Sequence, residues 1–268
     1  MSNLVTATYP SELKTGQFIS ESKNRFLCTV EIDGAEEVCY IASSCRLDNF
    51  IDLWGKSVLL IKNKGTKGRT QYSVIGVKHK RNYIILNTSW ANKAIHSSFL
   101  KRRFSFLGKR KDYRAEVDVS GYKADFYIPC SKTIIEVKSV ISTDDTAIFP
   151  TAYSERTLVQ LKRIAEILDE GYKGYFIIVS LNPYVKAIKF LQDTEVISQL
   201  NECIARGLIV KGFCCRLPAD GLPQITSEIP VQAWKKSLSR HPQRTSTEAL
   251  HALSLLQLSA WNRHLFAQ

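Results

Sequence analysis

The chain has no apolar run near the roughly 20 residues that a helix needs to cross a bilayer. Its first residues, MSNLVTATYPSELKTG, also lack the basic start and apolar block of a secretory signal. We therefore expect a cytoplasmic protein without a membrane partner. With 268 residues, 44% of them hydrophobic, the chain can bury the core of one large domain or two small ones.

Zinc-binding cysteine patterns are missing as well. The seven cysteines are scattered, include no C-x-x-C pair and fit no zinc spacing. In a cytosolic protein, such residues are expected to be ordinary reduced thiols.

Acidic residues are few relative to basic ones. Twenty-five Asp and Glu stand against 37 Lys and Arg, which gives a net charge of +12 and predicts a polyanionic partner, nucleic acid before membrane. Residues 99–114 carry seven of these cations and a single acid, with four aromatic side chains between them. The segment is either a solvated basic surface or a patch that contacts phosphates. The nucleic-acid contacts predicted here are Lys101, Arg102, Arg103, Lys109, Arg110 and Lys111.

Residues 1–86 are rich in strand signals. Two alternating segments around Gly34 predict a hairpin, and residues 56–88 contain three more short strands separated by polar loops. Five short strands in about 75 residues indicate a small closed barrel or a meander, because closure removes exposed sheet edges.

Residues 87–232 change character and predict an α/β domain with a mixed sheet. A helix is expected after Thr88 or Ser89, followed by three strands between 113 and 141, a helix from about 154 to 170, an apolar strand at 173–181 and a further helix and strand. Residues 233–268 are predicted to be a linker and a C-terminal helix, whose apolar stripe packs on the body or on a second copy. A homodimer is therefore one expectation.

The stretch TIIEVKS, residues 133–139, places two opposite charges in an apolar strand. Because side chains alternate along a strand, Glu136 and Lys138 share one face. The preceding predicted strands contribute Asp125 and Glu116. Two neighbouring carboxylates repel each other unless a cation lies between them, and Mg²⁺ prefers such ligands together with water and phosphate oxygens. A lysine beside the metal would orient or activate the attacking water.

A second interpretation is structural. Glu136 and Lys138 would form a local ion pair on an exposed sheet face, and Asp125 would lie at a turn. The spacing alone leaves the two interpretations open.

The surrounding residues resemble the sugar fermentation stimulation protein (SfsA) family. The strongest stretch is 116–182, with EVDVSGYKADFYI, TIIEVKS, FPTAYSER and the following helix; the likeness covers about residues 13–232. The resemblance implies an OB-fold domain followed by a domain of the PD-(D/E)xK nuclease superfamily, in a DNA-binding protein. It assigns the motif Asp, Glu and Lys to Asp125, Glu136 and Lys138, and an upstream acid to Glu116.

Three departures from the family pattern stand out. Lys123 replaces the usual Arg, which keeps a charge for nucleic acid but loses the bidentate fork. Gln160 replaces a helix His and is the fifth predicted catalytic residue. The N-terminal binding loop has Tyr40, Ala42, Ser44 and Cys45, so the family glycine is lost; a turn needing positive φ would be strained by Cys45.

Together these observations predict a Mg²⁺- or Mn²⁺-dependent nuclease with Asp125 and Glu136 as metal ligands, acting on DNA more readily than on RNA. A non-catalytic, regulatory DNA-binding protein whose metal site is degenerate or structural is the alternative. A third hypothesis is a protein-interaction module that uses the C-terminal helix.

Overall fold

The structure is a computed structural model that describes residues 13–24, 26–42, 51–63, 70–192, 194–218 and 221–233. The predicted tail helix and the loop residues Ser44 and Cys45 lie outside these residues. Within them, no helix is long and apolar enough to cross a membrane.

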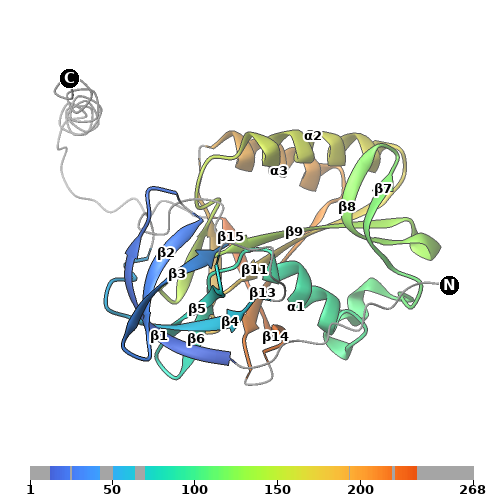
Figure 1. Ribbon diagram of the computed structural model, residues 1–268. Coiled ribbons are helices and arrows are strands. Elements are labelled where there is room, and N and C mark those ends of the chain that lie inside the picture. Colours follow the sequence, from blue (N-terminus) through green and yellow to red (C-terminus); the bar gives the residue numbers. More distant parts are fainter. Residues whose placement is uncertain are drawn as a thin grey trace, which may run out of the picture. The chain divides into compact units, whose positions relative to one another are not determined.

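The N-terminal half forms the predicted barrel (Figure 1). Antiparallel pairs join the strands in the order β3-β2-β1-β4-β5, parallel pairing of β3 with β5 closes the barrel, and β6 extends β5 as a hairpin. Asp33 and Gly34 both have positive φ in the β2–β3 turn, as a two-residue hairpin turn requires. The strands are β1 (Leu13–Glu21), β2 (Leu27–Ile32), β3 (Ala35–Ile41), β4 (Ser57–Lys62), β5 (Tyr72–His79) and β6 (Asn82–Ile85).

Strand β1 was missing from the sequence prediction, because Gly16 interrupts its strand pattern. The barrel needs that glycine. A Cβ at Gly16 would lie 2.6 Å from both the carbonyl oxygen of Glu31 and a methyl carbon of Val30. The residue that weakens the strand signal is thus the one that lets β1 pack closely on β2.

The C-terminal half contains the predicted mixed sheet, in the order β14-β13-β11-β9-β8-β7. Its central strands β13, β11 and β9 are parallel, and the other neighbours are antiparallel. A smaller parallel sheet, β10-β12-β15, was not predicted, because its strands have only three or four residues. The strands are β7 (Arg114–Val119), β8 (Tyr122–Ile128), β9 (Thr133–Val140), β10 (Thr146–Phe149), β11 (Lys173–Ser180), β12 (Ala187–Phe190), β13 (Ile209–Arg216), β14 (Gln224–Ile229) and β15 (Val231–Ala233).

Two hydrophobic cores pack on opposite faces of the mixed sheet, whose position between the helices and the barrel is seen in Figure 1. Helices α2 (Glu155–Asp169) and α3 (Glu195–Ala205) cover one face. The other face shares a continuous core with α1 (Trp90–Ser98) and the barrel interior. The two halves of the chain are also joined by the Ile85 N–H, which donates to the Leu181 carbonyl at 3.0 Å. The barrel is therefore packed directly against the sheet that carries the acidic residues.

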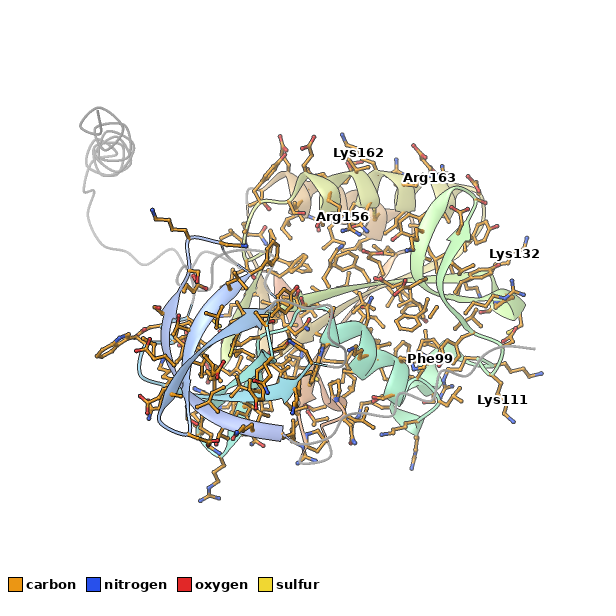
Figure 2. The ribbon with its side chains drawn as sticks, in the orientation of Figure 1. Phe99, Lys111, Lys132, Arg156, Lys162 and Arg163 are labelled. Carbon is orange, nitrogen blue, oxygen red and sulfur yellow. The ribbon has the colours of Figure 1, made fainter. Side chains whose placement is uncertain are left out.

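The basic cluster of residues 101–111 follows α1 and includes a short 3-10 helix, η2 (Arg102–Leu107). Arg110 is used structurally: its guanidinium donates to the carbonyls of Phe99, Lys101 and Gly108 at 2.6, 2.9 and 2.9 Å. Phe99 in turn is fully buried and stacks on Tyr113 with ring centroids 4.2 Å apart. The other five predicted contacts stay exposed, among them Lys111, labelled in Figure 2.

We expect Arg110→Ala to lower the free energy of unfolding by about 1–2 kcal/mol, because charge-assisted bonds to the carbonyls after α1 are lost. Lys111→Ala is the matched control and should change stability by less than about 0.5 kcal/mol, as at most exposed sites. Urea denaturation of the two variants measures the difference. Equal stabilities would show that water replaces the Arg110 contacts without cost.

Candidate active site

Asp125 lies where the backbone pairing between β8 and β9 ends. The last pair on this side is Phe126–Ile135, so the N–H of Val137 has no partner on β8. The Asp125 carboxylate accepts that N–H at 2.7 Å, and its other oxygen accepts a hydrogen bond from the Asn92 side chain of α1 at 2.8 Å. Asp125 is thus inside a strand rather than at the turn that the structural interpretation expected.

Glu136 is almost completely buried, with 2% of its surface exposed. Lys138 Nζ lies 2.7 Å from Oε1, and the Tyr122 hydroxyl donates to Oε2. Burial raises the pKa of Glu136, and the charge of Asp125 adds to this, while Lys138 opposes it. Burial and the Glu136 charge also raise the pKa of Tyr122, so its hydroxyl keeps the proton that it donates.

Lys138 connects Glu136 to α2. Its Nζ donates to Gln160 Oε1 at 2.6 Å. Helix α2 is fixed by an N-cap, in which Ser154 accepts the N–H of Thr157, and by a buried face that includes Leu161. The predicted sharing of one face by Glu136 and Lys138 is confirmed, and they form the ion pair of the structural interpretation too. However, that pair lies in a buried network and not on an exposed sheet face.

Glu116 reaches the site from a distorted strand. The pairs Ala115–Phe126 and Val117–Ala124 flank it, which places Glu116 across from Asp125. Its φ is +50°, which is unusual for a residue with a side chain and turns it away from a regular strand position. Glu116 is exposed and lies 3.6 Å from Lys123, so these two predicted residues form a solvent-exposed ion pair.

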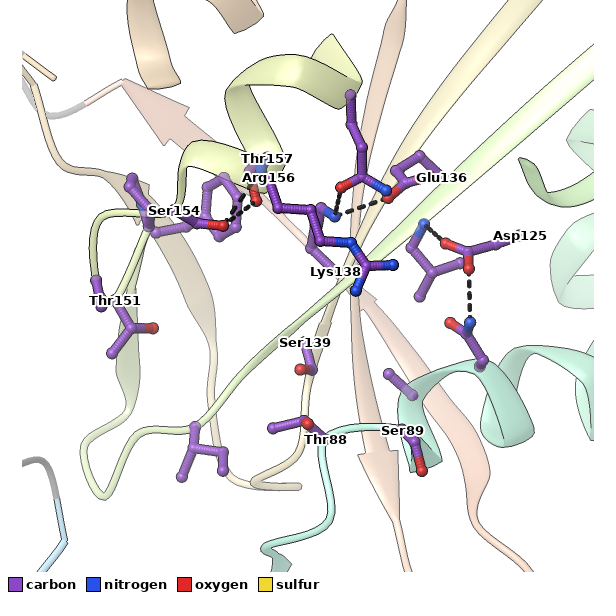
Figure 3. Close-up of a pocket in the computed structure, with 18 of the residues that line it drawn as sticks. Thr88, Ser89, Asp125, Glu136, Lys138, Ser139, Thr151, Ser154, Arg156 and Thr157 are labelled. Carbon is purple, nitrogen blue, oxygen red and sulfur yellow. Dashed lines mark hydrogen bonds and ion pairs between the residues drawn. The ribbon is translucent and has the colours of Figure 1, made fainter. Parts of the chain in front are cut away.

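Three neighbouring cavities meet at Asp125 and Asn92, which line all of them. The largest, about 560 Å³, also contains Glu136, Lys138 and Gln160 (Figure 3). The second, about 490 Å³, contains Glu116, Lys123 and again Gln160. The structure therefore gathers all five predicted catalytic residues around one carboxylate. None of the basic-cluster residues lines these cavities.

Two site residues escaped the sequence analysis. Asn92 lies 33 positions before Asp125, and no spacing rule connects a helix amide to a distant strand carboxylate. Tyr122 lies three residues before Asp125 in the same strand, which is a weak sequence signal for a site residue. The alternation of the strand instead predicts that Tyr122 is an ordinary core residue.

We expect Tyr122→Phe to destabilise the fold by about 1–3 kcal/mol, because the buried Glu136 carboxylate loses a hydrogen-bond donor. Tyr153→Phe, at a ring that is 70% exposed, is the control and should be neutral. Denaturant titration of both variants provides the measurement. If the two tyrosine variants are equally stable, the Tyr122–Glu136 bond contributes nothing to folding.

Fold and site together define a protein in which a closed OB-type barrel packs on a mixed α/β domain with a carboxylate–lysine cluster. Residues 21–86 match the profile of the SfsA N-terminal OB domain, and residues 89–221 match that of the sugar fermentation stimulation protein RE domain. The chain belongs to the sugar fermentation stimulation protein family, which confirms the resemblance noted above.

Individual relatives agree with this assignment. The homolog from Clostridium beijerinckii is 31% identical over 189 residues, which cover 67% of this chain and 82% of the relative. A homolog from Ruminiclostridium cellulolyticum is also 31% identical, over 62% of this chain and 74% of its own. The solved structure of Pyrococcus furiosus SfsA in complex with Ca²⁺ has a TM-score of 0.71 at 22% identity, covering 83% of this chain and 97% of that one, and thus shares the fold.

Proposed function

We propose that this chain is a metal-dependent nuclease that hydrolyses phosphodiester bonds in DNA, with RNA as a less favoured substrate. The observation that carries the proposal is the convergence of Asp125, Glu136 and Lys138 from two neighbouring strands on one cavity. The net charge of +12 supports a polyanionic substrate. The domain architecture supports it too, since OB barrels commonly bind nucleic acid strands.

The donor set fits a hard divalent cation. Asp125 is half-buried and each of its oxygens accepts one hydrogen bond, which leaves lone pairs directed at the cavity. Within the described residues, no three Asp, Glu, His or Cys side chains are grouped as metal ligands. Two carboxylates are still enough for Mg²⁺, because it usually takes one or two carboxylates and fills its shell with water and phosphate oxygens. Asp125 and Glu136 would hold it, supported by Glu116.

Such a metal, when bound, lowers the pKa of its water and neutralises charge that builds on the phosphate. The protein's own residues do the positioning. Lys138 has three N–H donors, of which Glu136 and Gln160 take two. The third is free to orient the attacking water or a phosphate oxygen, and Gln160 fixes the position of the ammonium group. The relative from Pyrococcus furiosus, solved with Ca²⁺, supports a divalent-cation site in this family.

A second candidate function is DNA binding without cleavage. The observation in its favour is that both oxygens of the Glu136 carboxylate already accept hydrogen bonds, one from Tyr122 and one from Lys138. In that case the cluster would be a structural network, and divalent cations would be dispensable.

We expect Asp125→Asn and Lys138→Ala to lower the rate of DNA cleavage in Mg²⁺ or Mn²⁺ by at least about 100-fold, a typical loss for groups that stabilise or protonate a transition state. EDTA should abolish cleavage by the unmodified protein. Asp144→Asn, at an exposed acid outside the cavities, should leave the rate unchanged. Incubation with labelled single- and double-stranded DNA and RNA gives the rates. Cleavage that persists in both site variants, or in EDTA, contradicts the nuclease; binding without any cleavage favours the second candidate.

We expect the exposed cations of residues 101–111 to make binding steeply salt-dependent. Each duplex phosphate contact contributes about −0.9 to the slope of log K against log salt concentration. Replacing Lys101, Arg102, Arg103, Lys109 and Lys111 together with Ala, while keeping Arg110, should therefore flatten the slope by several units. Fluorescence anisotropy in EDTA measures it, and Lys162→Ala with Lys173→Ala is the control. An unchanged slope would exclude this cluster as a binding surface.

A further inference from the structure

Arg156 differs from every other cation that lines the two larger cavities. In the described chain these cations are Lys123, Lys138, Arg156 and Arg163. Lys123 pairs with Glu116, and Lys138 pairs with Glu136. Arg163 pairs with Glu166 and Glu170. The Arg156 guanidinium makes no hydrogen bond or ion pair with any described residue, although Arg156 lines both cavities.

The guanidinium of Arg156 points from the first turn of α2 into the cavity (Figure 3). It is close enough to Tyr122 for its charge to act on that hydroxyl. An uncompensated guanidinium offers five N–H donors in a planar fork, which matches the oxygens of a phosphate in a bidentate contact. The residue is thus placed and charged to receive an anion that the protein itself does not supply.

Hydroxyl groups also line the same cavity. Thr88, Ser139 and Thr151 all line it, and none of their hydroxyls makes a hydrogen bond within the described residues. These residues come from three separate segments: the approach to α1, the end of β9 and the loop before α2 (Figure 3). Hydroxyls that donate single hydrogen bonds beside an arginine are the usual contacts of a nucleic-acid backbone.

We infer that this part of the cavity is a binding site for one backbone phosphate of the nucleic acid, with Arg156 as its principal contact and Thr88, Ser139 and Thr151 around it. The inference rests on the proposed function, since it takes a nucleic acid as the ligand. It adds a contact to the nucleic-acid strand that would lie next to Asp125. This contact is separate from the exposed cations of residues 101–111. That remote cluster attracts the backbone, whereas Arg156 sets which phosphate lies next to the carboxylates.

The test compares Arg156→Ala and Arg156→Lys with Lys162→Ala, an exposed lysine of the same helix that lines neither cavity (Figure 2). Binding of labelled single- and double-stranded DNA is measured in EDTA across a range of salt concentrations, so that cleavage does not interfere. Arg156→Ala should bind about 10- to 100-fold more weakly, as expected for a lost charge-assisted contact, and its salt slope should be shallower by nearly one unit.

Arg156→Lys keeps the charge but not the fork, so its salt slope should stay near that of the unmodified protein while its affinity falls. Lys162→Ala should bind like the unmodified protein. The inference is overturned if Arg156→Ala keeps the full affinity and slope, or if Lys162→Ala loses as much, which would indicate a diffuse charge effect. Circular dichroism confirms that each variant is folded.

The binding assay separates this inference from the nuclease proposal. If the unmodified protein cleaves DNA but Arg156→Ala binds and cleaves normally, the phosphate site is wrong and the nuclease stands. If nothing is cleaved in any metal but Arg156→Ala loses one phosphate contact, the nuclease is wrong and the phosphate site stands. If no nucleic acid binds at all, both are wrong.

Discussion

The hydrogen bond from the Val137 N–H to Asp125 is the contact on which the site depends. Val137 is 7% exposed, and a buried N–H without a partner costs free energy comparable to a lost hydrogen bond. Asp125 supplies this partner from inside β8, at the point where β8 and β9 stop pairing. Its second oxygen holds Asn92, so one carboxylate ties two strands to α1. Asp125 and Val137 both line the largest cavity, which therefore opens where the two strands stop pairing.

The sequence predicts the order of elements because alternation and helical periodicity are local signals. It does not predict the change of face within β8, where Ala124 packs beneath α2 but Phe126 packs in the core shared with the barrel. In a regular strand these two residues would share a face. The change occurs at Asp125, opposite the positive φ of Glu116, and neither position has the Gly or Pro that announces an irregular strand. Hence the acidic residues and their neighbouring strands could be predicted from the sequence, but the irregular backbone at Asp125 and Glu116 could not.

The two interpretations of TIIEVKS are compatible. Glu136 and Lys138 do pair, yet a buried pair is weak evidence for stability, because removing two charges from water offsets most of their attraction. Tyr122 adds a hydrogen bond to the Glu136 carboxylate, and Gln160 accepts one from Lys138. A fold that needed only rigidity here would be served as well by apolar side chains of similar volume. Rigidity alone therefore does not account for this buried pair, which lines the cavity that the proposed function uses.

Helix α1 connects the basic cluster of residues 101–111 to the Asp125 carboxylate. Asn92 in its first turn holds Asp125, and the basic cluster begins just after its last residue, Ser98. From Asn92 to Ser98 the helix rises about 9 Å at 1.5 Å per residue. Arg110 then fixes the backbone directly after the helix, where the exposed cations begin. Under the proposed function, a nucleic-acid backbone that this cluster attracts lies beside the same helix whose Asn92 holds Asp125.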